Sequence, residues 1–117
     1  MSNYESKYFK PAEFACKCGC GEAEVAEKLL RELDKIREHF GVPVSITSGR
    51  RCKKHNAKVG GATNSQHVLG TAADIVVKGV SPDKVYKYLS TTYPDRYGIG
   101  LYKSFCHFDV RPQKARW

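Results

Sequence analysis

Two histidines and one aspartate, His67, Asp74 and His107, carry the clearest chemical information in this sequence. Two imidazoles and a carboxylate are a common ligand set for a catalytic zinc ion, which takes three protein ligands and keeps a fourth position open for water. Such an ion lowers the pKa of bound water to roughly 7 and polarises a carbonyl group, which suits hydrolysis of an amide bond. The chain has only four histidines, and two of them belong to this set. We therefore interpret the three residues as the zinc ligands of a small hydrolase.

The aspartate of this set stands inside residues 72–77, a stretch that is otherwise apolar. Burying a carboxylate costs free energy unless it is paired or bound to a metal. An ion pair with an arginine, or a turn cap, is the alternative to metal binding, and we favour the metal. Gly70 permits the sharp turn that would bring His67 and Asp74 together.

The second histidine, His107, is followed two residues later by Asp109 on a predicted strand. Side chains two apart on a strand project from the same face. His107 can then bind zinc while Asp109 acts as the general base or orients a ligand. The reverse assignment, with Asp109 on the metal and His107 moving the proton, is also open, as is a core histidine bonded to the backbone.

Arg51 follows a predicted strand and precedes the long basic segment 52–66. Amide hydrolysis builds negative charge on the carbonyl oxygen, and that charge needs hydrogen-bond donors or a cation. A guanidinium can supply it, and it can also bind a peptide carboxylate through two hydrogen bonds. We assign Arg51 to catalysis and to substrate binding.

Hydrophobic periodicity and turn residues predict the elements that must position these side chains. Residues 22–40 carry apolar residues at three- and four-residue steps, which predicts a helix that ends at Gly41. Residues 52–66 form either a short helix with a loop or one long loop. The other predicted elements are a helical turn at Pro11, strands at 44–48, 71–77, 97–101 and 105–110, and a helix from Pro82 to before Pro94. This order predicts an α+β fold, a small antiparallel sheet with flanking helices, in a single domain covering residues 1–117.

The net charge of +8 is concentrated in the second part of the chain. Residues 1–38 contain seven basic and eight acidic residues, whereas residues 39–117 contain thirteen basic and four acidic ones. A basic body favours an anionic partner such as nucleic acid or the bacterial cell wall, although solubility alone would also explain it. No apolar run approaches the ~20 residues of a membrane span, so we expect no membrane insertion.

Five cysteines, Cys16, Cys18, Cys20, Cys52 and Cys106, are an odd number, and three of them form a tight Cys-x-Cys-x-Cys run. The first residues of the chain lack the apolar core of a signal peptide, so reduced thiols are expected. The run does not have the C-x2-C spacing of zinc ribbons. We favour free thiols over a second, structural metal site.

With these residues identified, the chain resembles the zinc D-alanyl-D-alanine carboxypeptidases and murein endopeptidases, whose fold is shared with the N-terminal domain of hedgehog proteins. Residues 48–52, Ser-Gly-Arg-Arg-Cys, look like the Ser-Gly-Tyr-Arg-Ser signature of that family. Residues 65–74 match its Ser-x-His-x2-Gly-x-Ala-x-Asp motif. Residues 98–109, followed by Arg116 and Trp117, resemble the subgroup with a His-x-Asp strand, which includes phage-borne peptidases.

The resemblance implies that His67, Asp74 and His107 hold Zn²⁺, that Arg51 contacts the substrate or the transition state, and that Ser65 lies at the substrate. It implies an enzyme that cleaves peptidoglycan stem peptides, as a carboxypeptidase or an endopeptidase. Many relatives carry an acid or a histidine shortly before the last ligand, but residues 103–106 are Lys-Ser-Phe-Cys. Asp109 is the remaining nearby acid, and it is therefore assigned as the base or the orienting group.

Without a signal peptide, we expect a protein made in the cytoplasm that reaches the cell wall after release during phage lysis, or as part of a virion. We expect a monomer. One alternative is a non-catalytic module that keeps the zinc and binds the cell wall. A second is a nucleic-acid binder using the Cys16–Cys20 run and the basic residues 50–58, which only the charge supports.

Overall fold

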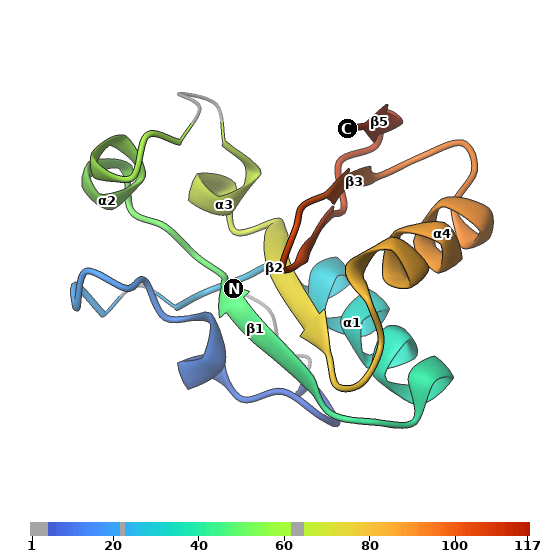
Figure 1. The fold of residues 1–117 in the computed structure, drawn as a ribbon. Helices are drawn as coiled ribbons and strands as arrows, with labels where there is room; N and C mark the ends of the chain where they lie inside the picture. Colours follow the sequence, from blue (N-terminus) through green and yellow to red (C-terminus); the bar gives the residue numbers. More distant parts are fainter. Residues whose placement is uncertain (1–4, 22, 62–64) are drawn as a thin grey trace.

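The computed structural model describes residues 5–21, 23–61 and 65–117, and it has the predicted α+β architecture (Figure 1). The five strands are β1 (Val44–Ser48), β2 (Ala72–Val77), β3 (Gly98–Leu101), β4 (Cys106–Asp109) and β5 (Ala115–Arg116). The helices are η1 (Pro11–Phe14, a 3-10 helix), α1 (Glu27–Phe40), α2 (Lys53–Lys58), α3 (Gln66–Leu69) and α4 (Pro82–Thr92). The predicted strands and the helix at Pro82 are confirmed, whereas β5 and the helix α3 were not predicted.

The strands form one sheet in the order β1-β2-β4-β3-β5. The neighbours β1/β2, β2/β4 and β4/β3 are antiparallel, as predicted, whereas the short edge strand β5 lies parallel to β3. A tight turn between β3 and β4 is closed by the Tyr102 N–H, which donates to the Phe105 carbonyl over 3.1 Å. The sheet is therefore antiparallel except at this edge.

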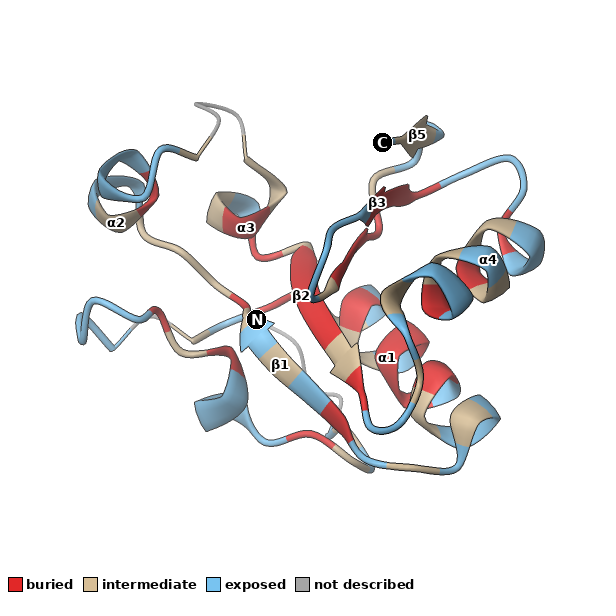
Figure 2. Cartoon of the chain, in the orientation of Figure 1, coloured by how far each residue is buried: buried red, intermediate tan, exposed pale blue. Residues whose placement is uncertain are grey.

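Alternation along the strands gives the sheet two different faces. On one face, Ala73 and Ile75 of β2, Ile99 of β3 and Phe108 of β4 join the hydrophobic core. Their strand neighbours Asp74, Gly98, Gly100, His107 and Asp109 project from the other face. Figure 2 shows that the central strands are buried, although they carry polar residues. The helices α1 and α4 complete the core with Leu29, Leu33, Ile36, Val85 and Leu89.

The helix predicted from residue 22 begins only at Glu27. Residue 22 lies outside the described part, and residues 23–26 are not helical. Tertiary contacts hold this lead-in, because the Ala26 N–H donates to the Gly70 carbonyl over 2.8 Å and the Arg50 guanidinium donates to the Glu24 carbonyl over 3.0 Å. Val25 is buried as its periodicity predicted, but it lies in an extended segment.

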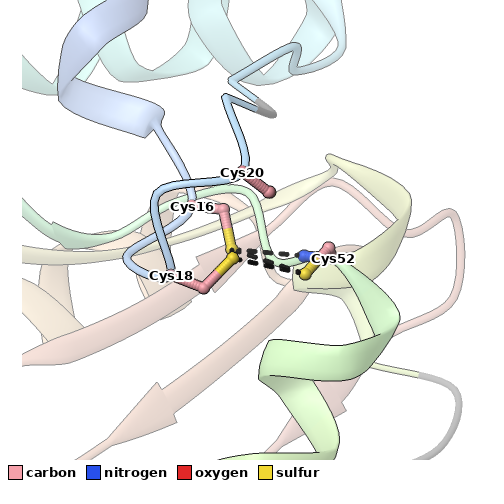
Figure 3. A group of neighbouring side chains, drawn as sticks. All are labelled: Cys16, Cys18, Cys20 and Cys52. Carbon is pink, nitrogen blue, oxygen red and sulfur yellow. Dashed lines mark hydrogen bonds between the residues drawn. The ribbon is translucent and has the colours of Figure 1, made fainter.

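The N-terminal part of the chain packs beside the segment that joins β1 to α2. The Arg50 N–H donates to the Phe14 carbonyl over 2.8 Å, and Phe14 is almost fully buried. Four cysteines gather where these two segments meet (Figure 3). The described cysteines form no disulfide. Within the described residues, no helix is both long and apolar enough to span a bilayer.

A buried carboxylate, Glu32, joins α1 to the other side of the core. It accepts hydrogen bonds from the hydroxyl groups of Tyr97 over 2.7 Å and Tyr93 over 3.0 Å. Burial alone would raise the pKa of Glu32, but these two hydroxyl groups and Lys35 outweigh it and lower the pKa. Because Tyr97 directly precedes β3, this network fixes one end of that strand to α1.

We expect Glu32→Ala to lower the free energy of unfolding by about 2–4 kcal/mol, because two buried hydroxyl groups lose their acceptor. Glu38→Ala is the control on the same helix, since Glu38 is half exposed and its ion pair with Lys7 spans 3.4 Å at the surface. We expect that control to change stability by less than about 1 kcal/mol. Urea unfolding of both variants measures the difference, and equal effects would contradict the role given to Glu32.

Candidate metal centre

The pairing of β2 with β4 places Asp74 directly opposite His107 on the face away from the core. Their side chains meet, with His107 Nδ1 3.0 Å from Asp74 Oδ1. Both residues are buried, at 6% and 7% exposure. Two of the three predicted ligands are therefore cross-strand neighbours, and the sheet register fixes their separation.

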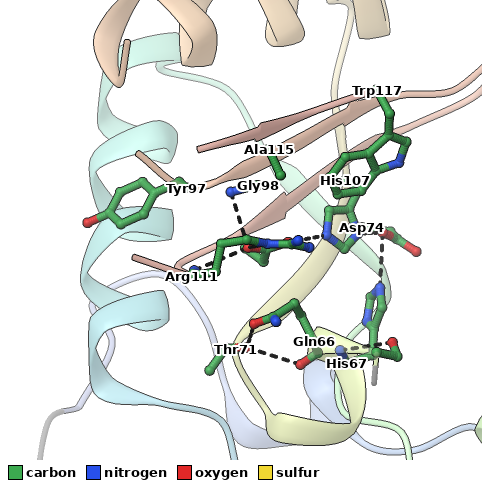
Figure 4. Close-up of polar contacts among 12 residues, drawn as sticks. Gln66, His67, Thr71, Asp74, Tyr97, Gly98, His107, Arg111, Ala115 and Trp117 are labelled. Carbon is green, nitrogen blue, oxygen red and sulfur yellow. Dashed lines mark hydrogen bonds and ion pairs between the residues drawn. The ribbon is translucent and has the colours of Figure 1, made fainter. Parts of the chain in front are cut away.

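The third predicted ligand, His67, reaches the same place from the short helix α3. The hydroxyl group of Ser65 caps this helix by accepting from the His67 N–H over 3.2 Å. Gly70 ends the helix in the left-handed conformation, φ 76°, which a residue with a side chain adopts only with strain. This turn carries the chain into β2, so that His67 Nε2 lies 3.3 Å from Asp74 Oδ1 (Figure 4). The turn predicted at Gly70 is confirmed.

The segment Gly49–Arg51 holds the His67 ring in one orientation. The Gly49 carbonyl lies 2.7 Å from His67 Nδ1, and the Arg51 N–H donates to the His67 carbonyl over 3.0 Å. A carbonyl oxygen only accepts, so Nδ1 carries the proton in the neutral ring and Nε2 keeps its lone pair. That lone pair points toward Asp74.

His107 is oriented in the same manner by a second carboxylate. Its Nε2 lies 2.7 Å from Asp109 Oδ2, and a carboxylate accepts, so the proton of the neutral ring is on Nε2. The lone pair of His107 Nδ1 then faces Asp74 Oδ1. Three lone pairs from His67, Asp74 and His107 converge on one buried point. Only a cation relieves this arrangement, either a metal ion or added protons, so the donor set fits a metal such as zinc.

The carboxylates around this point and His107 shift one another's pKa, each favouring the charged form of the other. Burial alone would raise the pKa of Asp74, but His107 and His67, when they carry the added protons, donate hydrogen bonds to it, outweigh burial and hold the pKa at about 2. Burial would likewise lower the pKa of His107, but Asp109 and Asp74 outweigh it and raise the pKa. The centre therefore holds an ionised carboxylate and strongly attracts a positive charge.

Asp109 is fully buried, and most of its oxygen lone pairs are engaged. The Arg111 side chain donates to both of its oxygens, over 2.8 and 2.7 Å, and the N–H groups of Gly98 and Arg111 donate to Oδ1 over 3.1 Å each. Burial alone would raise the pKa of Asp109, but His107 and Arg111 outweigh it and hold the pKa far below its usual range. Of the two roles predicted for Asp109, this geometry favours orienting His107 over accepting a proton.

Three residues around Asp109 and His107 were not identified as functional from the sequence. Arg111 is one, and its position two residues after Asp109 is the sequence feature that could have identified it. Gly98 is another, because a Cβ atom there would lie 2.2 Å from Asp109 Oδ2. Trp117 is the third, and its ring centroid lies 5.0 Å from that of His107 and 5.3 Å from the Arg111 guanidinium.

The other predicted site residues differ in how near they come to the three converging side chains. Arg51 Nη2 lies 3.8 Å from Asp74 Oδ2, and its Nη1 donates to Asn56 Oδ1 over 3.2 Å, so Arg51 reaches the centre. The neighbouring Arg50 turns away to the Glu24 carbonyl. Ser65 acts as a helix cap, and its contact with substrate stays a prediction.

In a comparison with protein families, residues 7–109 match the family described as Peptidase M15. The matched region contains His67, Asp74, His107 and Asp109. A search of curated proteins returned no match.

We expect Asp109→Asn to weaken zinc binding about 10- to 100-fold, the usual cost of losing a carboxylate that orients a metal-bound histidine. Competition with a chromogenic chelator measures the dissociation constant. Asp95→Asn is the matched control, because Asp95 is exposed in the loop after α4. Unchanged zinc affinity in Asp109→Asn would contradict an orienting role.

Proposed function

The chain belongs to the peptidase M15 family, a family of metallopeptidases, and from this premise we propose that it is a zinc peptidase that hydrolyses amide bonds in peptidoglycan stem peptides. It would act as a D-alanyl-D-alanine carboxypeptidase or as an endopeptidase. The observation that carries the proposal is the convergence of His67 Nε2, Asp74 and His107 Nδ1 on one buried point.

In this proposal His67, Asp74 and His107 hold the zinc ion, which when bound polarises the scissile carbonyl group and activates water. His67 is held by the Gly49 carbonyl and His107 by Asp109, so both rings are oriented before any substrate arrives. Such preorganisation avoids rearranging the site during the reaction. Asp109 acts here as a positioning residue.

Arg51 is proposed as the residue that faces the substrate. Its guanidinium approaches Asp74, and the Arg51 side chain as a whole is 18% exposed, so it is not fully closed off from solvent. A cation at this place stabilises the oxyanion of the tetrahedral intermediate or binds the terminal carboxylate of a stem peptide. The excess of basic residues after position 38 favours association with an anionic cell wall.

A non-catalytic wall-binding module is the second candidate, and one observation favours it. Among the described residues, the carboxylates that contact the predicted ligand histidines are Asp74 and Asp109, and both are engaged. Such a module would keep zinc and bind the wall, but a proton acceptor for hydrolysis would be lacking.

Incubation with peptidoglycan fragments and with a pentapeptide ending in D-Ala-D-Ala, followed by mass spectrometry, separates these candidates. Release of D-alanine that a chelator abolishes would identify a carboxypeptidase, and internal cleavage would identify an endopeptidase. Failure to hydrolyse either substrate with zinc fully bound would contradict the peptidase and favour the binding module.

We expect Arg51→Ala to lower kcat by about 10²- to 10³-fold, the usual effect of removing one donor to an oxyanion. Zinc content should stay unchanged, because Arg51 does not supply a metal ligand. Arg31→Ala serves as control, since Arg31 is exposed on α1 and pairs with Glu27 over 2.6 Å. Equal kcat in both variants would rule out the role proposed for Arg51.

A further inference from the structure

A second group of metal-ligating side chains lies apart from the histidine centre and consists of Cys16, Cys18, Cys20 and Cys52 (Figure 3). Their four sulfur atoms all lie within 4.8 Å of one another. Three of them come from the loop after η1, and Cys52 comes from the residue before α2. The fifth cysteine, Cys106, is buried in β4 and does not belong to the group.

The distances between the sulfur atoms match those around a tetrahedral metal ion. Cys16 Sγ lies 3.4 Å from Cys18 Sγ and 3.8 Å from Cys52 Sγ, and the Cys18 and Cys52 sulfurs are 3.6 Å apart. A zinc–sulfur bond of about 2.3 Å in tetrahedral geometry separates neighbouring sulfurs by about 3.8 Å. A disulfide would require about 2.05 Å. The observed spacing therefore fits ligands around one ion better than bonded pairs.

Backbone N–H groups point at two of these sulfurs. The Cys52 N–H donates to Cys16 Sγ and the His55 N–H donates to Cys52 Sγ, each over 3.4 Å. A neutral thiol is a weak acceptor, whereas a thiolate attracts such donors strongly. Lys17, Lys53 and Lys54 adjoin the cysteines in sequence. The surroundings are thus suited to thiolates, the form of cysteine that binds metal.

We propose that Cys16, Cys18, Cys20 and Cys52 bind one structural zinc ion. Four protein ligands complete a tetrahedral shell and leave no position for water, which is the arrangement of structural rather than catalytic zinc. Sulfur ligands favour zinc or iron, whereas the histidine centre offers nitrogen and oxygen. The two sites are chemically distinct, and this one does not depend on the proposed peptidase activity.

The position of Cys52 gives this ion a role in the architecture of the histidine centre. Cys52 directly follows Arg51, and the same segment supplies the Gly49 carbonyl that orients His67. An ion that joins Cys52 to the loop after η1 would hold the N-terminal segment against the segment Gly49–Cys52, which borders the histidine centre. The contact between Arg50 and Phe14 lies within the region fastened in this way. Because this site forms only in the folded chain, the free energy of binding the ion adds to the stability of the fold, so loss of the ion is expected to lower Tm.

The test is the zinc content of the full chain, purified under reducing conditions without chelator and measured by mass spectrometry. We expect two zinc ions per wild-type chain, one in His67→Ala and one in a Cys18→Ser, Cys20→Ser double variant. Cys106→Ala is the matched control and should keep two. One ion in the wild type together with none in His67→Ala would overturn the proposal.

Cobalt substitution decides the question even if the cysteine variant does not fold. Cobalt bound to thiolates gives an intense sulfur-to-metal charge-transfer band in the near ultraviolet. We expect this band in the wild type and equally in His67→Ala. Absence of the band from both proteins, or disulfides among these four cysteines in the reduced preparation, would contradict a zinc site, and iron in its place would contradict the choice of metal.

Discussion

The convergence of three lone pairs on one buried point is the constraint around which the rest of this structure is arranged. His67 Nε2 and His107 Nδ1 lie 3.3 and 3.0 Å from the same oxygen, Asp74 Oδ1. Both rings are held with the lone pairs of these nitrogens toward that oxygen. Without a cation these electron pairs would repel one another in a poorly solvated place. The folding energy of the surrounding core must therefore hold the arrangement together until a cation binds, which is the usual relation between metal sites and their scaffolds.

The sheet holds these side chains in place because its two faces differ: one packs in the hydrophobic core and the other carries the residues of the centre. Apolar residues of β2, β3 and β4 pack on α1 and α4, while the residues between them project into the metal centre. Gly98 leaves room for the Asp109 carboxylate, and Arg111 neutralises it. Because each strand serves both faces, a shift of register by one residue would destroy core and centre together. Metal geometry is in this way tied to hydrophobic packing.

The sequence alone predicted the residues that meet, because a carboxylate inside the apolar stretch 72–77 needs a partner and because the motifs around His67 and His107 resemble those of a zinc peptidase family. It also predicted the turn at Gly70 and most strands. It could not predict the late start of α1, since contacts of Ala26 with Gly70 and of Arg50 with Glu24 hold the lead-in extended. Nor could it assign the proton on each imidazole, which depends on the Gly49 carbonyl and on Asp109. The meeting of Cys52 with Cys16, Cys18 and Cys20 was equally out of reach, because spacing within the run does not reveal a distant fourth partner.

The central claim is that one metal ion binds between His67 Nε2, Asp74 and His107 Nδ1. A crystal structure of the zinc-loaded protein, with anomalous data collected at the zinc absorption edge, tests this most directly. The account predicts an anomalous peak about 2.0–2.1 Å from each of the two named nitrogen atoms and about 2.0–2.2 Å from an Asp74 oxygen. A peak bonded to His107 Nε2 or to Asp109, or no peak between these three side chains, would contradict it.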